Sequence, residues 1–118
     1  MNKKRESGFT MIELLVSLVI LTTGLLAISS MVYSVMNATS LSKETGTATA
    51  LMQDKMESLK HTAVSSLTAG NDTIRLGNVD YLRQWSVAAS ANTRAITVTV
   101  NWNNRGPHTV STSTLRGE

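Results

Sequence analysis

A single carboxylate stands at the start of the longest apolar run in the chain. Glu13 opens this run, and no other charged residue occurs from Leu14 to Ser42. A charged side chain costs roughly 2.5–3.5 kcal/mol at the centre of a membrane, and less near its surface. An acid in such surroundings is a functional candidate, and its chemistry requires a cationic partner that neutralises it.

The residues on either side of Glu13 resemble a membrane insertion signal. Lys3, Lys4 and Arg5 form a basic leader, and Leu14–Met36 supplies the roughly 20 apolar residues that a spanning helix needs. Basic residues before a span favour a cytoplasmic amino terminus. An ordinary secretory signal would need a small-x-small cleavage site after the apolar run, and residues 36–38 make a poor one.

The sequence Gly-Phe-Thr-Met-Ile-Glu-Leu-Leu-Val at residues 8–16 resembles the class III signal of type IV prepilins and type II secretion pseudopilins. The resemblance implies a leader of residues 1–8 that prepilin peptidase removes by cleavage between Gly8 and Phe9. It also implies N-methylation of Phe9 by the same peptidase/N-methyltransferase, and a role for Glu13 as the assembly glutamate. The implied partners are other pilin or pseudopilin subunits, the assembly platform and the bacterial inner membrane.

This arrangement has a physical reason. Cleavage converts the amide at Phe9 into a cationic amine, and helices that stack with an axial stagger can bring this amine to Glu13 of a neighbour. Two charges in a low dielectric must pair, because one left alone costs several kcal/mol. The pair therefore fixes register more than it adds stability. Removal of residues 1–8 also lowers the formal charge from +3 to +1, so the basicity does not indicate nucleic acid binding.

We therefore expect a minor pilin or pseudopilin, a structural subunit with its amino terminus in the cytoplasm and its carboxyl-terminal domain outside. It would join a filament after assembly. Features near residues 23–27, 50–57 and 98–102 are similar to minor subunits of the PilV or GspI kind. The alternative is an uncleaved, membrane-anchored extracytoplasmic binding module. The sequence contains no cysteine, so no disulfide constrains either form.

The fold that must position these residues is α+β. Residues 9–60 read as one helix without proline, with a transmembrane and assembly half at 9–36 and an amphipathic outer half at 37–60. In the outer half the apolar stripe expected to carry the sheet follows the 3.6-residue period, at Leu41, Ala48, Met52, Met56 and Leu59. In the first half, Gly24 is compatible either with close helix packing or with local unwinding on assembly.

Residues 61–118 are expected to form a small β domain of three or four antiparallel strands packed on the outer half of the helix. Residues 61–80 read as a linker with turn chemistry and a short strand at Thr73–Leu76. Alternation predicts strands at Tyr81–Ala88, Ala95–Trp102 and His108–Leu115. In the first of these, Arg83 is the exception on an otherwise apolar face, whereas Trp85 and Trp102 are expected in the core.

No pattern in the sequence indicates catalysis, a cofactor or a metal. His61 and His108 are far apart and lack cysteine partners, so a zinc site is not expected. Asn71, Asp72, Asn78 and Asp80 do not have EF-hand spacing and read as turn residues. Nucleophile-elbow and phosphate-loop motifs are also missing from the sequence, so we expect no enzyme.

Overall fold

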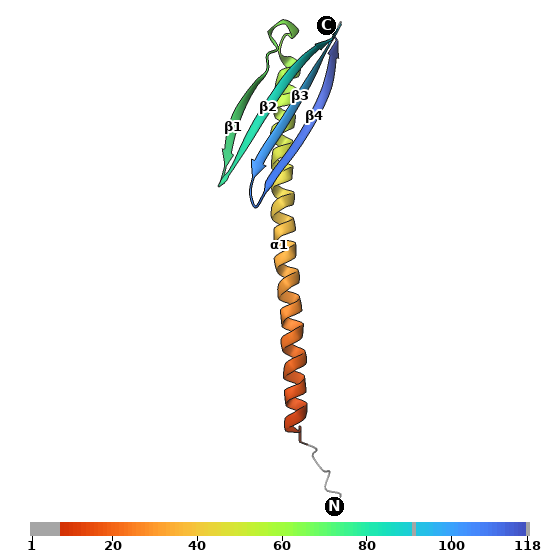
Figure 1. Cartoon of the computed structure of the whole chain (residues 1–118), viewed down its shortest axis with the longest axis vertical. Coiled ribbons are helices and arrows are strands. Elements are labelled where there is room, and N and C mark those ends of the chain that lie inside the picture. Colours follow the sequence, from red (N-terminus) through yellow and green to blue (C-terminus); the bar gives the residue numbers. More distant parts are fainter. Residues whose placement is uncertain (1–7, 91, 118) are drawn as a thin grey trace, which may run out of the picture. The chain divides into compact units, whose positions relative to one another are not determined.

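In the computed structural model, which describes residues 8–90 and 92–117, a long helix precedes a four-stranded antiparallel sheet (Figure 1). The helix α1 comprises Met11–His61, and a 3-10 turn, η1, comprises Val64–Ser66. The strands are β1 (Gly70–Leu76), β2 (Val79–Ser90), β3 (Thr93–Asn103) and β4 (Pro107–Gly117). The expected α+β class is confirmed. The chain divides into two compact units, one ending at Ser40 and one beginning at Leu41.

The helix of the first unit exposes apolar side chains on all its faces. This stretch of α1 is long and apolar enough to cross a membrane, and the protein itself buries none of its most apolar window. Five of its hydroxyl groups are satisfied locally, because each of them donates to a backbone carbonyl three or four residues earlier. This holds for Ser17, Thr22, Thr23, Ser29 and Ser30. These polar side chains therefore add little cost to burial in an apolar environment.

The core of the second unit lies between residues 48–59 of α1 and one face of the sheet. Ala48, Met52, Met56 and Leu59 are buried, as the helical stripe predicted, whereas Leu41 is 42% exposed and does not belong to it. The sheet contributes a buried set from β2 and β3, namely Tyr81, Ile96, Val98, Val100 and Trp102. The Trp102 expectation is confirmed, and Trp85 packs against this core while remaining partly exposed.

The four strands form a meander in the order β1-β2-β3-β4, as expected from their short connections. Each observed strand extends beyond its predicted bounds; β3, for example, covers Thr93–Asn103 rather than residues 95–102. The largest correction concerns residues 61–80. They are not mainly a linker, because β1 begins at Gly70 and pairs with β2 along all seven of its residues.

Two long-range contacts explain why the strand predicted from the sequence is shorter than β1. Gly70 lies opposite Trp85, and a Cβ on Gly70 would stand 2.7 Å from Cζ2 of the indole. Asp72 lies opposite Arg83 and accepts hydrogen bonds from its guanidinium at 2.8 and 2.6 Å. The glycine and the aspartate that resemble turn residues in the sequence are thus strand residues matched to β2.

Three polar contacts tie the sheet to α1 within the second unit. Arg83, although buried, donates to the carbonyl of Leu51 at 3.2 Å and to Asp54 at 3.3 Å. Glu44 accepts from Nε1 of Trp102 at 3.2 Å and from the amide of Asn104 at 2.5 Å. Near the other end, Arg116 donates to the carbonyls of Leu59 and Thr62 at 3.4 and 2.6 Å. These last bonds add a partner to carbonyls at the end of the helix, where the intrahelical hydrogen bonding stops.

Candidate assembly site at the start of the helix

The predicted processing and assembly residues surround the amino terminus of α1. Gly8 and Phe9 precede the helix and are exposed, with Phe9 at 75%. The helix begins at Met11 rather than at residue 9, and the amide of Leu14 donates the first helical hydrogen bond to the carbonyl of Thr10 at 3.1 Å. Gly8 and Phe9 therefore lie in non-helical, exposed backbone. Residues 1–7 of the expected leader lie outside the described residues.

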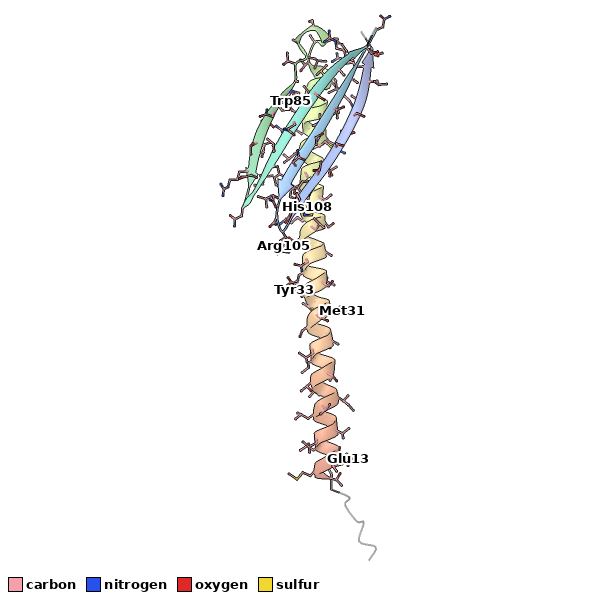
Figure 2. The ribbon with its side chains drawn as sticks, viewed as in Figure 1. Glu13, Met31, Tyr33, Trp85, Arg105 and His108 are labelled. Carbon is pink, nitrogen blue, oxygen red and sulfur yellow. The ribbon has the colours of Figure 1, made fainter. Side chains whose placement is uncertain are left out.

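Glu13 lies in the first turn of α1, at the start of the helix (Figure 2). There it forms a reciprocal cap with Thr10. The backbone N–H of Thr10 donates to Oε2 of Glu13 at 3.5 Å, and the backbone N–H of Glu13 donates to Oγ1 of Thr10 at 3.3 Å. This is the capping box, in which a threonine and a glutamate three residues apart satisfy each other's amides. A carboxylate at this position also interacts favourably with the helix dipole.

Sequence reasoning missed the role of Thr10. The signal was present, because Thr-x-x-Glu before an apolar run is the usual pattern of a helix start. The same cap turns the Glu13 carboxylate toward the amino-terminal side of the helix, one residue from the nitrogen of Phe9. Among the described residues, none of the salt bridges involves Glu13. The cap thus satisfies hydrogen bonds without neutralising the charge.

The other polar groups considered in the sequence do not assemble into a site. Asp72 pairs with Arg83, and Asp80 lies 3.7 Å from Arg75. His61 contacts Glu57 at 3.0 Å. The ring of His108 stacks on Trp102 with 5.3 Å between centroids. Across residues 8–90 and 92–117, no three His, Cys, Asp or Glu side chains are grouped to hold a metal.

Comparison with known families gives one match, and it falls on this site. Residues 3–29 match the family model described as the prokaryotic N-terminal methylation motif, which is the signal of type IV pilin-like prepilins. The match covers the basic leader, the capping box and the first part of the apolar helix. Neither the curated proteins nor the solved structures include a match to the chain. The amino-terminal segment is therefore similar to pilin-like prepilins, and a helix apolar enough to span a membrane follows it.

Proposed function

We propose that the chain is a minor pilin or pseudopilin, a structural subunit of a type IV pilus or a type II secretion pseudopilus. The observation that carries the proposal is the coincidence of the methylation motif with accessible backbone at Gly8–Phe9 and a charged Glu13 at the start of an uncovered apolar helix. The chain catalyses nothing in this role. It is the substrate of prepilin peptidase and N-methyltransferase, which cut after Gly8 and methylate Phe9.

The proposed assembly step is driven by neutralisation of the Glu13 carboxylate. Among the described residues Glu13 has no salt-bridge partner, and cleavage would create a cationic amine at Phe9. The capping box already orients this carboxylate toward the amino terminus, so the new amine of the same chain can approach it first. On assembly, the amine of a neighbour replaces it, and the apolar surface of residues 14–36 becomes covered by other helices. An uncompensated charge in that environment would cost several kcal/mol, so only one stagger of the helices is stable.

The proposed topology follows from the basic leader. Lys3, Lys4 and Arg5 keep the amino terminus on the cytoplasmic side of the inner membrane. The apolar half of α1 spans the bilayer once, and the unit from Leu41 onward is extracytoplasmic before and after assembly. The assembly platform would extract this single span into the filament.

A second candidate is an uncleaved, membrane-anchored binding module, and one observation favours it. The capping box gives Glu13 a purpose inside a single chain, because the carboxylate caps the helix without a neighbour. In that case the leader would remain attached and Glu13 would be a helix-start residue near the membrane surface.

Mass spectrometry of the amino terminus separates the two candidates. We expect a chain from the native membrane to begin at N-methylated Phe9, and a Gly8→Val variant to keep its leader. A matched Ser7→Val variant, changed one residue earlier, should be cut normally. Recovery of the functional protein with Met1 still attached would refute the filament proposal and support the anchored module.

A further inference from the structure

The two edge strands of the sheet differ in length and charge, and only one of them is suited to pair with a further strand. β1 and β4 are the edge strands, and each pairs with a single neighbour in the part of the chain that the structure describes. β1 is short and carries Asp72 and Arg75, and such charges discourage pairing with another strand. β4 has 11 residues, and its central part, Thr109–Leu115, contains no charge, glycine or proline. This long edge lacks the usual protection against strand addition.

A groove runs beside the unprotected edge. It has a volume of about 660 Å³ and lies between α1 and β4, with Thr112 as its lining residue from the sheet. From α1, the groove is lined by the charged Asp54, Glu57 and Lys60 and by Met52 and Met56, which are only 8% and 7% exposed. Arg116 connects β4 to the carbonyl ends of α1 near one end of the strand, and Trp102, on which His108 stacks, is bonded to Glu44 near the other. These contacts fix both ends of β4 against α1.

We propose that the free edge of β4 binds an extended segment of a different subunit of the same assembly, which adds a fifth strand to the sheet. Only an extended backbone presents alternating N–H and C=O groups that match those of an edge strand. Alternate side chains of that segment would enter the groove above Met52 and Met56 and should be apolar. The carboxylate of Glu57, which lines the groove and whose side chain is 64% exposed, favours a basic residue in the segment.

A second copy of this chain fits the edge poorly. The contacts at Glu44 and Arg116 show that β4 runs in the same direction as residues 44–62 of α1. Antiparallel pairing of two β4 strands would make these segments of the two chains run in opposite directions, whereas the subunits of the proposed assembly share one direction. Parallel pairing about a twofold axis would place Thr109, Ser111 and Ser113 of the copy over the methionines. Pairing with β1 of a copy would meet the charged edge.

Site-specific photo-cross-linking in the full chain tests this inference. A benzophenone side chain replaces Ser111 on β4 or, as the matched control, Thr73 on β1; both residues are exposed and lie on the outer face of an edge strand. We expect an adduct from position 111 at least about tenfold stronger than from position 73. Sequencing of the adduct should place it in one extended segment of a different chain that also has an N-terminal methylation motif.

Two further variants test whether the groove takes part. Thr112→Lys directs a long charged side chain into the groove and should reduce the adduct about tenfold, whereas Ser113→Lys on the opposite face should leave it unchanged. Equal adducts at both edges, adducts with this chain itself, adducts with lipid alone or no adduct would overturn the inference. If the Thr112→Lys variant fails to fold, the comparison of the adducts from positions 111 and 73 still tests the inference.

The inference rests on the proposed function, because it takes the partner from the same assembly. The amino-terminal mass, measured on the same sample, distinguishes the two failures. A methylated Phe9 terminus without a β4 adduct would refute the fifth strand alone. A retained leader would refute the filament proposal, whatever the cross-linking result.

Discussion

The guanidinium of Arg83 and the carboxylate of Asp72 form a two-bond contact between β2 and β1, at 2.8 Å from Nε and 2.6 Å from Nη2. The arginine side chain is 8% exposed and the aspartate side chain 36%. The pair therefore joins a buried cation to a carboxylate that water still reaches. Because Arg83 also contacts Leu51 and Asp54 on α1, this contact connects the edge strand, the sheet and the helix.

Because Arg83 is more buried than Asp72, mutations of the two residues should lower the free energy of unfolding by different amounts. Asp72→Ala leaves a buried guanidinium with only its helix partners, and we expect a loss of about 2 kcal/mol in the free energy of unfolding. Arg83→Met leaves only carboxylates that water can solvate, so it should cost less. Both tryptophans lie in the second unit, so fluorescence-detected unfolding of the full chain in detergent measures these losses.

The exposed Arg75–Asp80 pair supplies the control for this prediction. Both side chains are at least 60% exposed, so Asp80→Ala should change stability by less than about 0.5 kcal/mol. A result in which Arg83→Met is the more destabilising change would show that packing of the arginine, rather than its charge, dominates.

The same pair predicts a pH dependence. The hydrogen bond from Arg83 holds the pKa of Asp72 below its ordinary value of 3.8, and the charge of Arg83 acts in the same direction. The folded state therefore binds this proton less tightly than the unfolded state, so the contribution is present above pH 3.8 and is lost as the pH falls through the folded pKa. Acid unfolding should be steeper in the wild type than in Asp72→Asn below that pH. Parallel curves would contradict the assignment.

Glutamine at position 13 separates charge pairing from helix capping. A glutamine can complete a capping box with Thr10 but carries no charge. If Glu13 pairs with a neighbour's amine, Glu13→Gln and Glu13→Ala should both be processed normally and both reduce incorporation into filaments about tenfold or more, since roughly 1.4 kcal/mol corresponds to tenfold. The measurement is the ratio of filament-bound to membrane-bound chain.

The matched change on the other side of the cap is Thr10→Val. It removes the hydroxyl that accepts from the amide of Glu13 and retains the carboxylate. We expect near-normal incorporation of this variant. Normal assembly of Glu13→Gln together with poor assembly of Glu13→Ala and Thr10→Val would assign Glu13 to capping alone.

Two glycines should respond to alanine in opposite directions. In Gly70→Ala, the new Cβ would meet the indole of Trp85 at 2.7 Å, so the ring must move. Nε1 of this indole donates to the carbonyl of Thr68 at 3.1 Å, and its ring lies 3.7 Å from Nζ of Lys55. We expect a cost of about 1–3 kcal/mol and a shifted tryptophan emission.

Gly46→Ala is the corresponding change inside α1, where nothing lies within 4 Å of an added Cβ. Alanine is favoured over glycine in a helix interior by about 1 kcal/mol, so the variant should be more stable. Unfolding monitored by circular dichroism checks the sign of both changes. A stabilising Gly70→Ala would contradict the close approach of Trp85 to β1.

The long helix and the methylation motif of the amino-terminal half could be predicted because their determinants are local. The basic leader, the Gly-Phe boundary, the acid at position 13 and the uncharged run of residues 14–42 stand next to one another in the chain. The fold class and the helical stripe also follow from short-range periodicity. The capping box was readable from the same residues, since its two members are three positions apart.

The details of the sheet depended on partners distant in sequence. Gly70 and Asp72 have the residue types of a turn, yet contacts with Trp85 and Arg83 make them strand residues. In the predicted strand, Arg83 is the one charged residue on an otherwise apolar face. Only the fold brings together the two aspartates that neutralise it. Local sequence thus determined the methylation motif and the helix. Tertiary structure decided how β1 joins the sheet and which edge stays open, because burial and charge pairing depend on neighbours that chain order does not reveal.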